Sequence, residues 1–218
     1  MLDLLLPRRC VVCRAVGEQL CATCAAALPR LQPPLCERCG APTVWPVSRC
    51  GECAGRRLAF GAARAAVVYD RTVKGLIRDW KERGLRGLAV PAAGLVAGSV
   101  PRPDVAMLTF VPPDGDRLLQ RGHHPAEALA RELGRCWTIP VQPLLVRTGP
   151  VPRQAGLTLA ERRRNVRTVF RGVRSCPTSV CLVDDVYTSG ATADAAARAL
   201  RRAGARRVSV CTFTRAVR

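Results

Sequence analysis

Two consecutive carboxylates, followed by a short run of small and hydroxyl-bearing residues, form the stretch of this sequence best suited to chemistry. The acids are Asp184 and Asp185, and the run is Thr188, Ser189, Gly190, Ala191 and Thr192. Paired carboxylates can accept hydrogen bonds from vicinal sugar hydroxyls, or hold Mg²⁺ through bound water. Backbone N–H groups at a helix start lack intrahelical partners and attract anions. The stretch therefore predicts a site for a ligand with a phosphate at one end and sugar hydroxyls at the other.

The residues on either side predict the elements that hold this site. Residues 180–183 are an apolar run typical of a strand buried on both faces, and an alanine-rich stretch up to Arg202 favours a helix. A strand ending in acids, then a small-residue turn and a helix start, is how α/β sheets build phosphate sites. An ordinary strand–turn–helix with Asp185 near the N-cap is the simpler interpretation, but it leaves the ordered string of hydroxyls and glycine unexplained.

From about Leu58 onward, strands alternate with helices. Strands are expected at 65–69, 105–111, 141–146, 169–170, 180–184 and 207–213. Helices are expected at 73–81, 85–99, 126–135, 157–165 and up to residue 202. This alternation predicts an α/β fold, with a mostly parallel sheet flanked by helices on both faces. Ligands on such sheets bind at the carboxyl ends of the strands, where both Pro112 and Asp184 are expected.

Eight of the twelve cysteines form four C-x-x-C pairs. They are Cys10 and Cys13, Cys21 and Cys24, Cys36 and Cys39, and Cys50 and Cys53. Each pair can reach one tetrahedral metal from a single turn, and a second turn completes the site. The simplest assignment is two structural zinc ions, one held by the first two pairs and one by the last two, although an interleaved pairing also satisfies the spacing. Disulfides are the weaker alternative, because no secretion signal is visible and a cytosol keeps thiols reduced.

The change of pattern divides the chain into two predicted domains. Residues 1–57 form a cysteine-rich double zinc ribbon with few apolar residues, so that the metal must supply folding free energy. Residues 58–218 form the α/β domain, and 218 residues suffice for one full domain and a small one. Without an apolar run long enough for a membrane span or a signal-peptide core, a soluble cytoplasmic protein is expected.

The formal net charge of +19 leaves two alternatives open. Basic proteins attract nucleic acids, membrane surfaces and phosphorylated small molecules, so DNA or RNA binding and a merely solvated basic surface are equally compatible with it. Only Lys74 and Lys81 are lysines among the 35 basic residues. They project from similar sides of the helix predicted at 73–81. A pyrophosphate contact and a solvent-exposed helix face without a binding role both fit this spacing.

The string V-C-L-V-D-D-V-Y-T-S-G-A-T, residues 180–192, resembles the 5-phosphoribosyl-1-pyrophosphate (PRPP) motif of type I phosphoribosyltransferases. The resemblance implies an enzyme that binds PRPP, or another ribose phosphate, together with Mg²⁺. It implies that Asp184 and Asp185 contact the ribose hydroxyls and are the catalytic residues. The run 188–192 is then expected to hold the 5′-phosphate.

Two further stretches are similar to the ComF branch of that family. Residues 111–126, V-P-P-D-G-D-R-L-L-Q-R-G-H-H-P-A, resemble its valine–proline strand end and arginine-rich loop. A second set tracks the branch's flexible segment, and comprises Arg147, Gln154, Leu157, Arg162 or Arg164, Asn165 and Phe170. The likeness implies that the loop after Val111 holds pyrophosphate through its backbone and through Arg117 and Arg121, with Lys81 as a further candidate.

The clearest departure from the branch is His123-His124-Pro125, which replaces an expected Phe-Asn-Gln. For the two histidines, surface or helix-cap roles are favoured over a general base. The branch is tied to DNA uptake during natural transformation, so a second function stands beside the enzyme. It is a non-catalytic accessory protein that binds single-stranded DNA, and other DNA-uptake proteins, on a transferase-fold platform.

Overall fold

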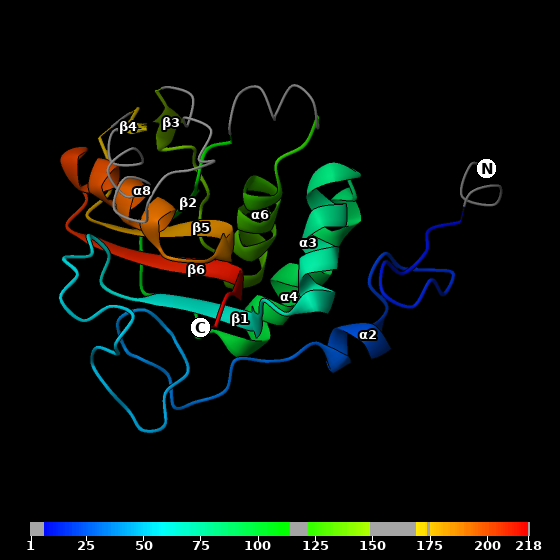
Figure 1. Cartoon of the computed structure of the whole chain (residues 1–218). Coiled ribbons are helices and arrows are strands. Elements are labelled where there is room, and N and C mark those ends of the chain that lie inside the picture. Colours follow the sequence, from blue (N-terminus) through cyan, green and yellow to red (C-terminus); the bar gives the residue numbers. More distant parts are fainter. Residues whose placement is uncertain (1–6, 114–121, 149–168, 174, 218) are drawn as a thin grey trace, which may run out of the picture.

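A four-stranded parallel sheet in the order β1-β6-β5-β2 forms the centre of the molecule (Figure 1). The computed structural model describes residues 7–113, 122–148, 169–173 and 175–217. The strands of this sheet are β1 (Ala63–Val68), β2 (Met107–Phe110), β5 (Ser179–Tyr187) and β6 (Arg207–Arg215). The predicted α/β fold with a parallel sheet is confirmed.

Helices cover both faces of the sheet (Figure 1). They are α3 (Arg71–Glu82), α4 (Ala89–Ser99) and α6 (Pro125–Trp137) on one face and α8 (Ala191–Arg202) on the other, with a 3-10 turn η1 (Arg86–Leu88) before α4. Along β5, Cys181 and Val183 pack in the core beneath α3, α4 and α6, whereas Val180 and Leu182 pack in the core beneath α8. This alternation explains why the strand is a continuous apolar run.

The sequence of helix α3 explains where the helix begins and which of its faces is buried. Asp70 is its N-cap, and the carboxylate accepts a hydrogen bond of 2.8 Å from the backbone N–H of Val73. The buried face consists mainly of apolar residues at helical spacing, among them Leu76 and Trp80. Lys74 and the outer face are left exposed, while Lys81, in the last turn, is half-buried.

Two strands differ from the expectation. β5 continues through the acids to Tyr187, because Val186 and Tyr187 have high strand propensity and still pair with β6. The strand expected at 141–146 pairs with β2 only at Val141, and Pro143, two residues later, has no N–H to donate. The chain then forms β3 (Leu145–Arg147), which pairs antiparallel with β4 (Phe170–Gly172) in a separate sheet. The helix expected at 157–165 lies outside the described residues.

The cysteine-rich segment runs along the β1 edge of the sheet and contains one short helix, α2 (Ala22–Ala27) (Figure 1). Backbone hydrogen bonds join it to β1, from Leu31 N–H to Ala66 O at 3.0 Å and from Val68 N–H to Pro29 O at 2.8 Å. No helix in the described ranges has both the length and the apolar character needed to cross a lipid bilayer.

Candidate functional site

Cysteine thiols gather in two groups of four in the N-terminal segment. The groups are Cys10, Cys13, Cys21 and Cys24, here the first ribbon, and Cys36, Cys39, Cys50 and Cys53, here the second ribbon. Within each group all sulfurs lie within 4.8 Å of one another. The Cys36–Cys53 and Cys39–Cys50 sulfurs are 3.6 and 3.4 Å apart. Sulfurs around one tetrahedral zinc are expected about 3.8 Å apart. The predicted sequential pairing is therefore confirmed over the interleaved one.

One thiol of each group has a lowered pKa. The neighbouring Cys21 side chain raises the pKa of Cys24, and burial raises the pKa of Cys39 and of Cys53. Burial raises the pKa of the Cys36 thiol, but backbone N–H donors of Cys39, Cys50 and Arg38 outweigh this and lower the pKa to about 6. One of these bonds joins Cys50 N to Cys36 Sγ at 3.3 Å. In the first ribbon the pKa of Cys10 is likewise lowered to about 6, against the effect of burial, by backbone N–H groups. Cys10 and Cys36 are therefore mostly thiolates at neutral pH, the form that binds zinc, and the other thiols lose their protons when the metal binds.

We expect the purified protein to contain two zinc ions per chain and the Cys50→Ser variant to contain one. A Ser hydroxyl does not replace a thiolate as a zinc ligand, and three remaining thiolates hold the metal less tightly. Elemental analysis of dialysed protein measures the ratio. Cys136→Ser, which removes an exposed cysteine outside both groups, serves as the control and keeps two. Two zinc ions retained in Cys50→Ser would contradict the assignment.

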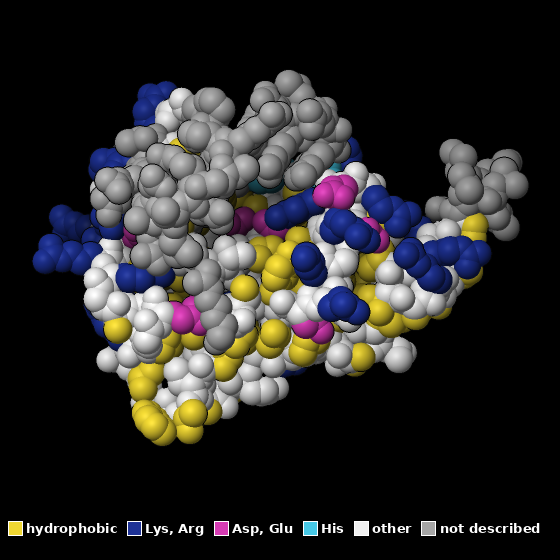
Figure 2. Space-filling model, viewed as in Figure 1, with side chains coloured by type: hydrophobic (Ala, Val, Ile, Leu, Met, Phe, Trp, Pro, Cys, Tyr) yellow, Lys and Arg dark blue, Asp and Glu magenta, His cyan; other side chains and the backbone are white. Residues whose placement is uncertain are grey.

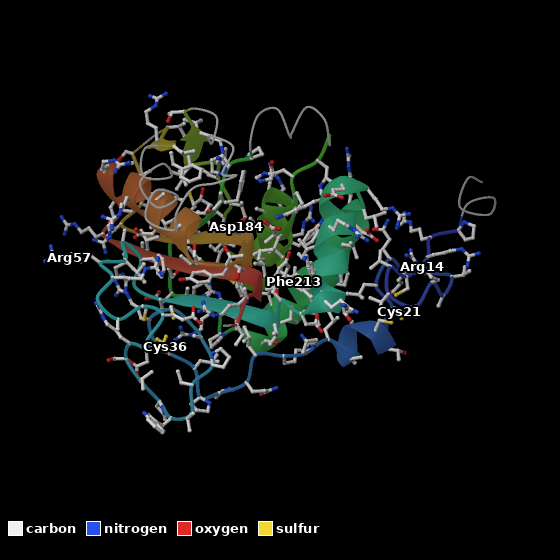
Figure 3. All side chains as sticks on the ribbon, viewed as in Figure 1. Arg14, Cys21, Cys36, Arg57, Asp184 and Phe213 are labelled. Carbon is white, nitrogen blue, oxygen red and sulfur yellow. The ribbon has the colours of Figure 1, made fainter. Side chains whose placement is uncertain are left out.

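The two predicted acids lie at the carboxyl end of the sheet. They are among the last residues of β5 and do not follow the strand. Asp185 is buried and forms an ion pair with the Lys81 ammonium, which reaches it from α3. Asp184 is half-buried, and its Oδ1 accepts a hydrogen bond of 2.9 Å from the Asp185 backbone N–H. In Figure 3, Asp184 lies in the space between α8 and α6. The sequence predicted both acids and Lys81 as site residues but not that two of them pair.

The pKa values of Asp184 and Lys81 are both raised in this site. Burial, then the adjacent charge of Asp185, raises the pKa of Asp184 well above its usual range. Burial opposes the charged form of Lys81, but the carboxylates of Asp185 and Asp184 outweigh this and raise the pKa of its ammonium. Lys81 therefore remains a cation at neutral pH, and Asp184 keeps its proton to a higher pH than an ordinary aspartate.

The predicted phosphate run forms the turn from β5 into α8. Gly190 is the N-cap of α8 and has φ 72°, a left-handed conformation that glycine adopts without strain. A Cβ at this position would overlap the hydroxyl of Tyr187. Ser189 Oγ accepts a hydrogen bond of 3.4 Å from the Ala191 N–H, and Thr188 is exposed. Glycine is therefore required both by the backbone and by its neighbour.

The histidine pair is not at the surface, contrary to one of its two favoured roles. His123 is buried with Nε2 against the Trp80 carbonyl. His124 is at the N-cap of α6 but makes no side-chain cap bond. Burial lowers the pKa of His124, although the charges of Glu127 and Asp185 oppose the change. The correction follows from the packing of this loop, where the His124 ring contacts Phe110 edge to face at 5.5 Å. Arg117 and Arg121 lie outside the described residues.

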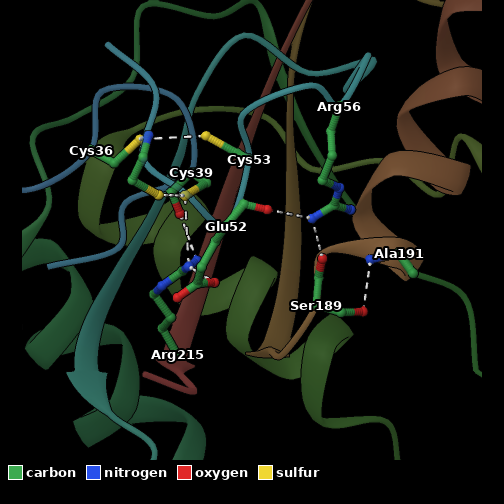
Figure 4. Close-up of polar contacts among 9 residues, drawn as sticks. Cys36, Cys39, Glu52, Cys53, Arg56, Ser189, Ala191 and Arg215 are labelled. Atoms are coloured by element: carbon green, nitrogen blue, oxygen red, sulfur yellow. Dashed lines mark hydrogen bonds and ion pairs between the residues drawn. The ribbon is translucent and has the colours of Figure 1, made fainter. Parts of the chain in front are cut away.

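Sequence reasoning missed two arginines that join the second ribbon to this site (Figure 4). Arg56 follows the ribbon and donates to the carbonyl oxygen of Ser189 at 2.8 Å. Arg215, at the end of β6, is 1 % exposed and contacts Cys39 and Glu52. In an arginine-rich sequence neither residue stands out. The only local signal is that Arg215 extends a strand otherwise buried on both faces.

The fold and its metal centres define a double zinc ribbon joined to an α/β parallel sheet flanked by helices. Residues 1–54 match the family described as the double zinc ribbon domain. The chain is 25% identical over 224 residues to competence protein F of Haemophilus influenzae, covering 95% of this chain and 97% of that protein. It is 28% identical over 232 residues to DNA utilization protein YhgH of Salmonella typhi, covering 97% and 99%. The chain is thus homologous to these two proteins along nearly its whole length.

One solved structure with partial likeness is the glutamine phosphoribosylpyrophosphate (PRPP) amidotransferase of B. subtilis, complexed with ADP and GMP. It is 24% identical, with a TM-score of 0.40. The superposition covers 57% of this chain and only 26% of the amidotransferase.

Proposed function

We propose that this protein binds PRPP with Mg²⁺ and transfers its phosphoribosyl group to an acceptor. The observation that supports this most is the succession, along one buried strand, of two carboxyls and a glycine turn that opens a helix. Asp184 and Asp185 suit sugar hydroxyls, and the N–H groups of the turn suit the 5′-phosphate of the same ribose. A single ribose 5-phosphate moiety would engage both halves.

The reaction breaks the bond from ribose C1 to pyrophosphate and forms a bond from C1 to a nucleophile of the acceptor. The aspartates hold the sugar, and the turn holds its 5′-phosphate, so that positioning and electrostatics supply the rate without a covalent intermediate. Mg²⁺, when bound, neutralises the charge that develops on the leaving pyrophosphate. Arg117 and Arg121 are the proposed pyrophosphate contacts, because arginine forms charge-assisted, bidentate bonds with phosphate.

Lys81 has a defined role in this proposal. Its ammonium is already at the acids through the ion pair with Asp185. When the ribose hydroxyls occupy that carboxylate, the mobile lysine side chain would be free to turn to the pyrophosphate. Lys81 thus neutralises Asp185 in the ligand-free protein and the departing anion in the complex.

Calorimetric titration of the zinc-loaded protein with Mg²⁺ and PRPP tests binding, and pyrophosphate release tests transfer. Nucleobases, nucleosides and single-stranded DNA are offered separately as acceptors. The proposal expects Mg²⁺-dependent binding and release of pyrophosphate with one acceptor class. Absence of heat with both PRPP and ribose 5-phosphate would overturn it.

A second function is favoured by a different observation, the distribution of exposed cations. Figure 2 shows Lys and Arg side chains gathered over α3 and the first ribbon. Arg71, Lys74 and Arg78 are exposed along α3, and Arg9 and Arg14 are exposed on the first ribbon. The relatives are named for competence and DNA utilization. We infer, as the alternative, an accessory protein of DNA uptake that binds single-stranded DNA on this surface and needs no catalysis.

For that alternative, Arg71→Ala is expected to weaken single-stranded DNA binding and to lower the salt slope of log K by about 0.7, the value for one lost phosphate contact. A gel-shift series in salt measures both. Arg57→Ala removes the same charge from an exposed position far from Arg14 in Figure 3, and is the control. Equal salt slopes for the two variants would exclude α3 as the DNA surface.

A further inference from the structure

The second ribbon is attached to the proposed phosphate turn by a direct hydrogen bond. Arg56 lies three residues beyond the zinc ligand Cys53, and its backbone N–H closes the ribbon turn onto the Cys53 carbonyl at 3.2 Å. Its Nη1 donates to Ser189 O at 2.8 Å and to Glu52 O at 3.5 Å (Figure 4). A guanidinium is planar and permanently charged, so it fixes the direction of the Ser189 carbonyl. The next peptide N–H is that of Gly190.

A second connection runs through the buried Arg215. Its Nη1 donates to Cys39 O at 2.6 Å and its Nη2 to Glu52 Oε2 at 2.8 Å, so that both halves of the second ribbon hold one guanidinium. The same guanidinium lies over the ring of Tyr187, 4.6 Å from its centroid. The Tyr187 hydroxyl in turn fills the space beside Gly190. The ribbon therefore also supports the side chain against which the turn packs.

The chain that leaves the second ribbon is fastened to the first turns of α8. Ala59 N–H donates to Asp194 Oδ1 at 2.7 Å, and Arg198 Nη2 donates to the Arg57 carbonyl at 2.6 Å. Asp194 is in the first turn of α8, directly after the phosphate turn. The first ribbon differs, because its buried Cys10 packs in the core beneath α3, α4 and α6. Among the contacts of the described residues, the second ribbon supports this turn and the first ribbon does not.

We propose that the second zinc site positions the phosphate-binding turn, with Arg56, Glu52 and Arg215 as the positioning residues. The free energy of zinc binding folds the second ribbon, and the ribbon fixes the conformation of Ser189 and Gly190 in which the turn can receive a phosphate. For its ligand, this inference rests on the proposed function. By linkage, if zinc in the second ribbon increases the affinity for a phosphorylated sugar, the sugar must increase the affinity for that zinc by the same factor.

The test compares zinc-loaded wild type, Arg56→Ala and Arg57→Ala. The two variants lose the same charge from adjacent positions, but the Arg57 side chain is exposed, and its carbonyl, which Arg198 uses, is unchanged. Amide hydrogen exchange of residues 189–193 is expected to be about tenfold faster in Arg56→Ala, as loss of one charge-assisted hydrogen bond implies. Calorimetry with ribose 5-phosphate is expected to show a similar, about tenfold loss of affinity. Arg57→Ala matches wild type in both.

The two readouts separate this inference from the proposed function. If wild type binds neither ribose 5-phosphate nor PRPP, the proposed function fails, while the exchange rates still decide whether Arg56 holds the turn. Unchanged exchange in Arg56→Ala overturns the inference. If Arg56→Ala does not fold, Arg56→Lys, which keeps the charge but not the planar fork, is judged by the same criteria.

Zinc retention gives an independent outcome. Cys13→Ser leaves the second ribbon as the only complete group of four thiols, and Cys50→Ser leaves the first. Ribose 5-phosphate at saturation is expected to raise zinc retention against a fixed concentration of chelator in Cys13→Ser and not in Cys50→Ser. Equal protection of both variants, or of neither, would show that the second zinc is not coupled to the turn.

Discussion

Asp185→Asn is expected to weaken Mg²⁺·PRPP binding by about a hundredfold and to destabilise the ligand-free protein. The binding loss follows because an amide neither attracts Mg²⁺ nor accepts charge-assisted hydrogen bonds as a carboxylate does. The loss of stability follows because Lys81 would keep its charge in a half-buried position without its partner. One substitution therefore lowers both affinity and stability.

Asp184→Asn is expected to weaken binding to a similar extent but to stabilise the ligand-free protein. The pKa of Asp184 is raised in the fold, first by burial and then by Asp185. The unfolded chain ionises this group near its usual pKa of about 3.9, so the free energy of unfolding falls as pH rises from there to the raised folded pKa. Asparagine removes this dependence and the cost of a buried charge.

Calorimetry and thermal unfolding between about pH 5 and about pH 8 measure these effects together. Wild-type affinity for Mg²⁺·PRPP is expected to increase with pH through the raised pKa of Asp184, and this increase should vanish in Asp184→Asn. Asp104→Asn is the control, because the Asp104 side chain is 95% exposed and pairs only with a surface arginine. Opposite stability changes for the two neighbours are the decisive result. Equal stability changes in the two variants would contradict the opposite effects assigned to Asp184 and Asp185.

The features that the sequence could predict are those that depend on local spacing. Ligand pairs such as Cys36 and Cys39 fall within one turn, and the apolar run before Asp184 identifies a strand buried on both faces, as the structure confirms. The assignment of Asp184, Asp185, residues 188–192, Arg117, Arg121 and Lys81 to PRPP stays a prediction, as does the domain boundary after residue 57. The PRPP assignment depends on bound ligands and the domain boundary on how the two segments fold. Residue spacing determines neither.

What could not be predicted are side-chain pairs between distant segments. Lys81 and Asp185 meet only because α3 packs beside β5, and Arg56 meets Ser189 only because the second ribbon folds against α8. In an arginine-rich chain, Arg215 differs from its exposed equivalents only in that it extends a strand otherwise buried on both faces. Such contacts follow from tertiary packing. Packing also places the second ribbon, which contains no predicted catalytic residue, against the turn beside the acids.

Gly190→Ala is expected to abolish the phosphate site while leaving most of the fold intact. At φ 72° an alanine costs about 1–2 kcal/mol, and its methyl group would overlap the Tyr187 hydroxyl, so the turn or the ring must move. Affinity for ribose 5-phosphate is expected to fall by more than about tenfold, because a displaced turn no longer directs its N–H groups at one phosphate. Calorimetry and thermal unfolding measure the two effects.

The contribution of Tyr187 can be separated from that of the backbone. In a Tyr187→Phe background the hydroxyl is absent, so Gly190→Ala should destabilise the protein less than it does in wild type, and the difference is the coupling between the two positions. Gly94→Ala is the matched control, because Gly94 lies exposed within α4 with open space around it and no positive φ. There alanine should stabilise the protein by about 0.5–1 kcal/mol. If Gly190→Ala behaves like Gly94→Ala and binds ribose 5-phosphate normally, the turn is not the phosphate site.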